Sequence, residues 1–200
     1  MPLRAARPVV AWLAAVALLP AMALAQDWKA YSYPDVGFAV QFPQAPTVKK
    51  STFTTSSGMT LPMTRYEVRG DRVVYSVDVV DFSSSQPDAD RTIAAAEKAL
   101  GTTGKVTVAI NARVNREFGR ELSVNGTDGS CSAIALFFAN GHLFKLQGKS
   151  LPPDAIARSG DTTRFEESLQ FIGRNRGFRG FGGFGRPGRG RRPRAAPAGS

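Results

Sequence analysis

Alternation of apolar and polar residues with a period of two is the feature of this sequence that most restricts its fold. Residues 38–42 place Phe38, Val40 and Phe42 at alternate positions, and residues 105–114 carry Val, Ile or Ala at every second position. Successive side chains of a β-strand point to opposite faces, so such segments are predicted to be strands. The predicted strands are residues 37–42, 47–56, 59–69, 72–82, 105–114, 118–124, 130–139 and 142–146.

Short turn sequences connect several of these segments. Ser57-Gly58 separates two predicted strands, and Asn140-Gly141 separates two more. Asn-Gly pairs favour two-residue hairpin turns, and strands that are joined by such turns pair antiparallel. The sequence therefore predicts an antiparallel sheet.

The period changes to that of a helix in two places. After Asp88, a predicted N-cap, the apolar residues Ile93, Ala96 and Leu100 recur at helical spacing up to Gly101. A second helix is predicted over residues 162–171, with Asp161 as its cap and an apolar stripe of Phe165, Leu169 and Ile172. Strands and helices in this order predict an α+β fold, in which two or more helices flank an antiparallel sheet.

The first 25 residues have the three-part pattern of a secretory signal peptide. Arg4 and Arg7 precede an uncharged apolar run, and small residues stand before the expected cleavage site at Gln26. The run is too short for a membrane span, which needs about 20 apolar residues. We expect a signal peptide over 1–25 and an exported, periplasmic or secreted, mature protein. Cys131 is the one cysteine, so residues 26–173 are expected to form a single domain without an internal disulfide.

Charge is concentrated at the C-terminal end. The chain has 26 Lys and Arg and 16 Asp and Glu; two of the basic residues lie in 1–25 and eight lie in 174–200, and neither segment contains an acid. That leaves 16 basic and 16 acidic residues for 26–173, a net charge of zero. The eight arginines of the tail are Arg174, Arg176, Arg179, Arg186, Arg189, Arg191, Arg192 and Arg194.

The tail, residues 174–200, is rich in Gly as well as Arg, and this composition predicts disorder. Phe178, Phe181 and Phe184 recur every three residues among these glycines and arginines, as in RGG-type segments. Arginine binds phosphate, and aromatic rings stack on bases or enter a lipid interface. The predicted partners of the tail are an anionic envelope lipid, a polysaccharide, a nucleic acid or an acidic protein. A solvated extension without a partner is the alternative.

The core resembles exported bacterial domains of the PsbP/Mog1-like class. The resemblance rests on the opening run 33–43, YPDVGFAVQFP, and on FEESLQF at 165–171, and it covers about residues 28–173. These residues are mostly core and turn residues, so the resemblance speaks for a fold. It implies a sheet sandwiched by helices, and it implies a non-catalytic accessory or binding module. The basic tail departs from that class.

Two residues of the core are candidate ligand contacts. His142 is the only histidine and opens a predicted hairpin strand, where a turn-edge histidine without a function is the simpler interpretation. Arg120 shares strand parity with Phe118 and Leu122, so it is predicted to bury its stem or to lie at a bulge beside Gly119. Cys131 is expected to be buried and inert.

The sequence contains none of the common hydrolase, zinc-protease or phosphate-loop motifs, and no cofactor, metal site or catalytic residue is predicted. The favoured function is an exported non-catalytic accessory or binding domain with a cationic tail. The alternatives are a small periplasmic enzyme that uses Arg120 or His142, and a nucleic-acid-binding protein that acts through its RGG-like tail.

Overall fold

The computed structural model describes residues 27–153, 155–156 and 159–173. The predicted leader 1–25 and the tail 174–200 therefore lie outside the described residues. The strands are β1 (Lys29–Tyr33), β2 (Phe38–Phe42), β3 (Thr47–Thr54), β4 (Thr60–Arg69), β5 (Val73–Asp81), β6 (Gly104–Val114), β7 (Glu117–Gly126), β8 (Cys131–Ala139), β9 (His142–Ser150) and β10 (Gln170–Phe171). The helices are α1 (Ala89–Leu100) and α2 (Gly160–Glu167).

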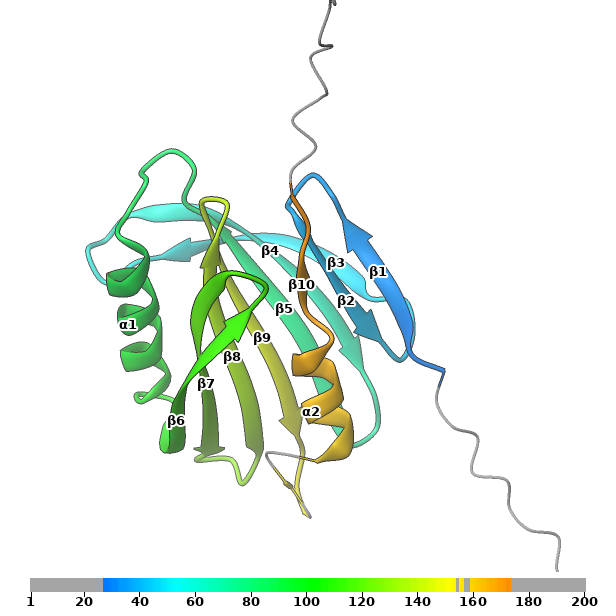
Figure 1. Ribbon diagram of the computed structural model, residues 1–200. Helices are drawn as coiled ribbons and strands as arrows, with labels where there is room; N and C mark the ends of the chain where they lie inside the picture. Colours follow the sequence, from blue (N-terminus) through cyan, green and yellow to red (C-terminus); the bar gives the residue numbers. More distant parts are fainter. Residues whose placement is uncertain (1–26, 154, 157–158, 174–200) are drawn as a thin grey trace, which may run out of the picture.

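Seven strands form one antiparallel sheet in the order β3-β4-β5-β9-β8-β7-β6 (Figure 1). Each strand of the runs β3-β4-β5 and β6-β7-β8-β9 pairs with the next one along the chain, and the pairing of β5 with β9 joins the two runs. The predicted antiparallel α+β fold is thus confirmed.

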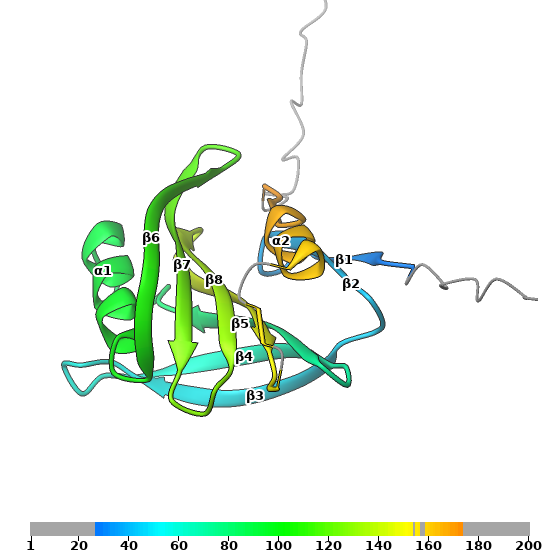
Figure 2. The ribbon, with the colours of Figure 1, turned by 90° about the horizontal axis from the view of Figure 1, so that it is seen from below.

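A second sheet, in the order β1-β2-β10, lies with α2 on one face of the large sheet, which curves around them (Figure 2). We call this the inner face. The opposite, outer face carries α1, which packs on β8 and β7. Both ends of the described chain belong to the small sheet, where β1 and β10 flank β2 on its two sides.

Aromatic side chains fill the inner core. Phe38, Phe42, Phe144 and Phe165 are completely buried. The ring of Phe165, from α2, lies 5.2 Å from the ring of Phe42 and 5.3 Å from that of Tyr75, measured between centroids. These contacts hold α2 and the small sheet against β5 and β9. Burial of a side chain of this size stabilises the fold by about 1.5–3 kcal/mol.

Aliphatic side chains fill the outer core. Ile93 of α1 packs on a cluster that includes Leu122, Ile134, Leu136 and Leu143. Leu61 of β4 and Val80 of β5 belong to the same cluster, and farther along these two strands the outer face carries Arg65 and Asp78.

The local signals that set the ends of α1 and the β8–β9 hairpin were predicted correctly. The carboxylate of Asp88 accepts a hydrogen bond from the backbone N–H of Arg91 at 2.8 Å, and Gly101 is the C-cap. At the hairpin, Asn140 and Gly141 have φ of 52° and 78°, as a type I′ turn requires.

The prediction for the last helix was wrong in two respects. Ser159, not Asp161, is the N-cap, and α2 ends at Glu167. Leu169 therefore lies beyond the helix, although it is buried with Phe165 as expected. The chain leaves the helix because residues 170–171 pair with β2 as a strand. Strand β1 was not predicted, since its sequence KAYSY lacks a clear apolar alternation.

Three predictions for the second half of the sheet also need correction. A bulge between Val106 and Val108 places these two valines on opposite faces of β6, so the expected apolar row is divided. Val106 pairs with Val124 of the outer cluster, and Val108 pairs with the neighbouring residue, Ser123. No bulge lies at Gly119. Cys131 is only partly buried, at the beginning of β8, where its thiol lies 3.5 Å from Oδ1 of Asn125.

Candidate functional site

Arg120 lies on the outer face of β7 and connects the sheet to α1. Its Nε and Nη2 donate to the two carboxylate oxygens of Glu97 at 3.0 and 3.2 Å, and its Nη1 donates to Oδ1 of Asn111 at 2.7 Å. The hydrogen bond to Glu97 raises the pKa of the Arg120 guanidinium above its already high value. Arg120 is therefore held by three directed contacts, and the prediction that it buries part of its stem is confirmed by a side chain that is 28% exposed.

A hollow of about 490 Å³ lies beside this ion pair, between α1 and the β6–β7 hairpin. Its apolar surface comes from Ile93, Ala94 and Phe118, and its other lining residues are Asp90, Glu97, Asn111, Gly119 and Arg120. Phe118 is 66% exposed at its rim. Apolar surface beside a few fixed polar groups is typical of a ligand-binding hollow.

Gly119 allows the hairpin to approach the rest of the sheet at this point. A Cβ on Gly119 would overlap the backbone oxygen of Leu136 and the ring of Phe137. Phe137 is 1% exposed and belongs to the inner core, so it has little room to move. Glycine at this position therefore permits the close packing of β7 against β8.

The residues that line this hollow are suited to binding a ligand rather than to catalysing a reaction. Among the described lining residues there is no Ser, Cys, His, Lys or Tyr that could act as a nucleophile, and the Asp90 and Glu97 carboxylates come from the same helix. The five guanidinium N–H groups of Arg120 exceed the three donated bonds, so further donors remain for a carbonyl or carboxylate. We take this hollow, named here the α1 hollow, as the candidate binding site of the core.

His142 lies at the beginning of β9, next to the hairpin turn as predicted, and its ring is buried. Its Nδ1 lies 3.0 Å from the backbone oxygen of Asn140, an acceptor, so the Nδ1–H group donates there. Its Nε2 lies 3.7 Å from Oδ1 of Asp81, which is too long for a hydrogen bond. A hollow of about 270 Å³ that also includes Ser51 and Thr64 adjoins this pair.

The structure does not bring Arg120 and His142 together. His142 pairs with Ala139 of the inner core, and Arg120 projects from the outer face toward α1. The hollows that they line share no residue. A single active site that uses both residues is therefore absent from the described part of the chain.

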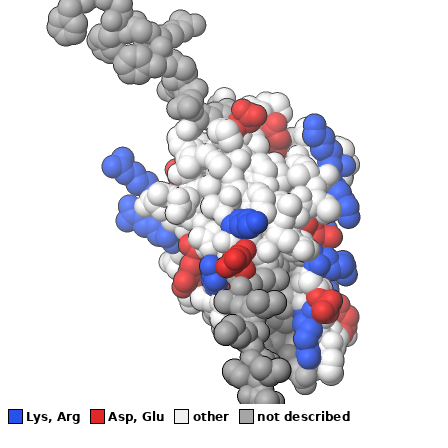
Figure 3. Space-filling model, turned by 90° about the vertical axis from the view of Figure 1, so that its right-hand side faces the viewer, with Lys and Arg blue, Asp and Glu red and all other residues white. Residues whose placement is uncertain are grey.

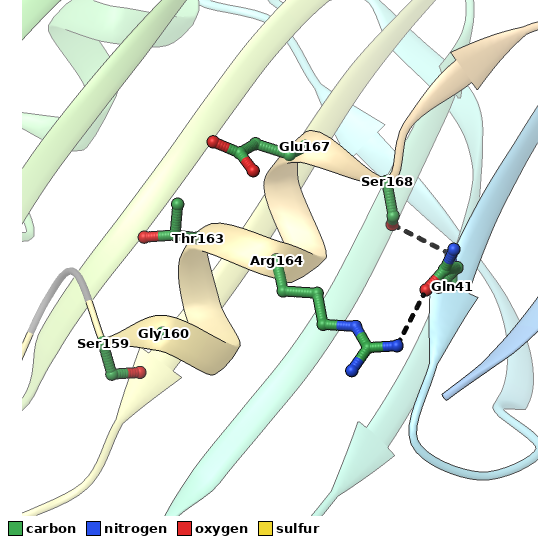
Figure 4. A pocket seen from close by; sticks show the side chains of 7 residues that line it. All are labelled: Gln41, Ser159, Gly160, Thr163, Arg164, Glu167 and Ser168. Carbon is green, nitrogen blue, oxygen red and sulfur yellow. Dashed lines mark hydrogen bonds between the residues drawn. The ribbon is translucent and has the colours of Figure 1, made fainter. Parts of the chain in front are cut away.

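A third hollow, of about 630 Å³, lies along α2 beside β2 (Figure 4). The Oγ of Ser168 accepts a hydrogen bond from the backbone N–H of Gln41 at 2.9 Å, and Arg164 Nη2 lies 3.4 Å from Gln41 Oε1. The Arg164 guanidinium also lies over the ring of Trp28, 5.1 Å from its centroid. Arg164 and Glu167 point away from one another in Figure 4, so these groups do not converge on one ligand position.

Sequence reasoning missed a row of charges that crosses the outer face. Register places Arg65 of β4 and Lys145 of β9 on either side of Asp78 of β5. Arg65 Nη2 donates to Asp78 Oδ2 at 2.8 Å, its Nε donates to Oδ1, and Lys145 Nζ lies 3.0 Å from Oδ2. The strand parity of Asp78 was visible in the sequence, but which cations lie opposite it depends on the register of three strands.

The carboxylate of Asp78 is buried, with a residue exposure of 4%. Burial by itself would raise the pKa of Asp78, but the hydrogen bond from Arg65 and the charge and hydrogen bond of Lys145 outweigh it and hold the pKa below its usual value. The row is therefore a saturated structural network, with each cation bound to Asp78. On the face seen in Figure 3, acidic and basic side chains likewise lie next to one another, and much of the surface between them is uncharged.

The described residues contain neither a metal-binding cluster nor a membrane-spanning helix. No group of three His, Cys, Asp or Glu there could hold a metal ion. No helix in the same residues combines the length and the apolar character that a membrane span requires. The predicted polyanion-binding arginines and phenylalanines, Arg174 to Arg194, all lie outside the described residues.

Comparison with known proteins gives no family. No family model matches the chain. No curated protein matches it either. A crystal structure of a Pseudomonas aeruginosa protein of unknown function is similar over 62% of this chain and 83% of that chain, with 10% sequence identity and a TM-score of 0.35. A similarity at this level carries no argument about fold or function.

Proposed function

We propose that this chain is an exported, non-catalytic binding or accessory domain whose cationic tail attaches it to an anionic surface or polymer. The observation that carries the proposal is the distribution of charge: 16 basic and 16 acidic residues in 26–173, against eight arginines and no acid in 174–200. A charge asymmetry of this kind is typical of an interaction tail.

The ion pairs of the core support the proposal that the tail, and not the core, binds the anionic partner. Arg65 and Lys145 are bound to Asp78, and Arg120 is bound to Glu97. These cations are thus neutralised by partners within the fold, whereas the arginines of the tail have no acidic neighbours in sequence. Each basic residue near a charged membrane contributes about 1 kcal/mol of attraction, so several arginines suffice for attachment.

The non-catalytic part of the proposal rests on the candidate sites. Arg120 and His142, the two residues that favoured an enzyme, line separate hollows on opposite faces of the sheet. The α1 hollow, with its exposed Phe118 and fixed Arg120, has the character of a binding surface.

We also propose that the core belongs to the PsbP/Mog1-like class. Support comes from the antiparallel sheet with α1 on one face and α2 on the other, and from the use of the resembling segments in one small sheet, where β10 pairs with β2. An experimental structure with the same strand order as a PsbP-like domain would test this assignment.

The experiment that tests the function compares the full chain with a chain that ends at Gly173. Each is mixed with anionic vesicles, neutral vesicles, an acidic polysaccharide and DNA, and the bound fraction is measured by sedimentation. We expect the full chain to bind the anionic probes and the shortened chain to remain in solution. Equal binding by both would contradict the proposal. N-terminal sequencing of the mature protein tests export, since a protein that retains residues 1–25 would favour the nucleic-acid-binding alternative.

A further inference from the structure

Strand β6 is an edge of the large sheet and carries exposed apolar side chains. In the described part of the chain, β7 pairs with one side of β6 and no strand pairs with the other. Val108 is 39% exposed and Ile110 is 49% exposed, although both are β-branched residues that are suited to a sheet interior. A long apolar edge is a surface to which another strand can add.

The other edges of the two sheets differ from β6. Strand β3, at the opposite edge of the large sheet, carries Lys49 and Lys50 on its two faces. In the small sheet, β1 has five residues and begins with Lys29, and β10 has only two residues. Charge and short length are the usual protections of an edge strand. Among the described edges, β6 is the one that combines length with an uncharged run.

The protection of β6 is confined to its first half. Lys105 and the bulge between Val106 and Val108 lie there. From Val108 to Val114 the register with β7 is regular, and Arg113 is the only charged residue. A bulge disrupts pairing locally, so the stretch that can accept a further strand is Val108–Val114.

We propose that β6 pairs antiparallel with β6 of a second copy of this chain, through the stretch Val108–Val114. The pairing that uses the whole stretch is centred on Asn111. It places Val108 opposite Val114 of the second copy, and Ile110 opposite Ala112. All of these side chains lie on the inner face, because Ala112 and Val114 pack against the inner core and Val108 and Ile110 alternate in step with them.

This pairing avoids contact between like charges and is compatible with two-fold symmetry. Arg113 lies opposite Ala109, so the arginines of the two copies do not face one another. The same segment is used by both chains, as a two-fold dimer requires, and the two large sheets become continuous. The inference goes beyond the proposed function and does not depend on it. Its consequence for that function is that a dimer carries two tails, which increases avidity by about 10²–10⁴-fold where both tails reach one surface.

The test measures the mass of the full chain in solution by size-exclusion chromatography with light scattering, over the whole accessible concentration range and without any polyanion. We expect a dimer that dissociates on dilution. The variant Ile110→Lys should be monomeric, since it places a charge within the apolar row. The change should be tolerated by the monomer because Ile110 is half-exposed and its neighbour on β7 is Glu121.

The matched control is Val48→Lys, which introduces the same charge at an exposed position of the opposite edge strand and should leave the dimer intact. Hydrogen exchange locates the interface independently, because the amides of 108–114 should exchange more slowly as concentration rises. A parent chain that is monomeric at all concentrations overturns the proposal. So does a dimer that Ile110→Lys and Val48→Lys affect equally, or one without added protection in 108–114.

Discussion

At the scale of single residues, Asp78 is the buried charge that organises the outer face of the large sheet. Its two oxygens receive bonds from Arg65 and Lys145, which belong to the strands on either side. Removing one member of such a group leaves the others without compensation in a partly buried position.

The variant Asp78→Asn should therefore lower the free energy of unfolding by about 2–3 kcal/mol, the range for lost hydrogen bonds between charged groups. The expected loss of stability is smaller than for a fully buried ion pair, because Arg65 is 38% exposed and can be hydrated. Urea denaturation measures the change. The control is Asp128→Asn, which removes an exposed negative charge beside Lys149 but keeps an oxygen that can accept the hydrogen bonds from Ser130, and it should have little effect. An Asp78→Asn variant as stable as the parent would contradict this role.

The same network predicts how stability depends on pH. Because the pKa of Asp78 is lower in the folded state than in the unfolded state, its contribution is complete above the unfolded value, about 3.9. That contribution is lost as the pH falls through the lower, folded pKa. The free energy of unfolding of the parent chain should thus decrease below about pH 4 more steeply than that of Asp78→Asn. Parallel curves for the two proteins would exclude this contribution.

At the scale of secondary-structure elements, glycine decides how closely the β6–β7 hairpin approaches its neighbours. The Gly119→Ala variant should lower the free energy of unfolding by about 1–3 kcal/mol, as overpacking of a dense core does, because the new methyl group overlaps Leu136 and Phe137. Thermal or urea denaturation measures this loss.

Gly160 provides the matched comparison, since a Cβ there meets nothing within 4 Å and the residue opens helix α2. The Gly160→Ala variant should be neutral or should gain up to about 1 kcal/mol, because alanine loses less backbone freedom in a helix. Equal effects of the two substitutions would show that the close approach at Gly119 is not what limits stability.

The sequence predicted elements best where a local signal set them. The cap at Asp88, the Asn140-Gly141 turn and the alternation in β2 and β5 each depend on neighbouring residues, and each was predicted correctly. The end of α2 was not, because pairing of residues 170–171 with β2, far away in the sequence, overrides the helical pattern.

The candidate site was predictable only in part, for a related reason. Because Arg120 and Leu122 are two residues apart on one strand, the sequence predicts that they share a face of β7. The structure shows this to be the outer face. Its partner Glu97 lies on α1, and no local pattern indicates that this helix packs over β7. The bulge in β6 between Val106 and Val108 could likewise not be predicted, because apolar and polar residues alternate regularly through this part of the sequence.

At the scale of the whole molecule, the excess positive charge and the described fold belong to different parts of the chain. The last described strand, β10, adjoins the β6–β7 turn, where the backbone N–H of Phe171 donates to Oδ1 of Asn115 at 3.0 Å. The described chain therefore ends at Gly173, close to the β6–β7 turn, and the tail, residues 174–200, follows in the sequence.

The most direct test of the central claim is the salt dependence of binding to one anionic probe, single-stranded DNA, for the full chain and for the chain that ends at Gly173. If the arginines of the tail displace counterions, the logarithm of the binding constant of the full chain should fall linearly with the logarithm of salt concentration, with a slope of about −0.7 for each phosphate contacted. The shortened chain should show no measurable binding at any salt concentration. The same affinity and slope for both chains would place the anion-binding surface in the core and contradict the account.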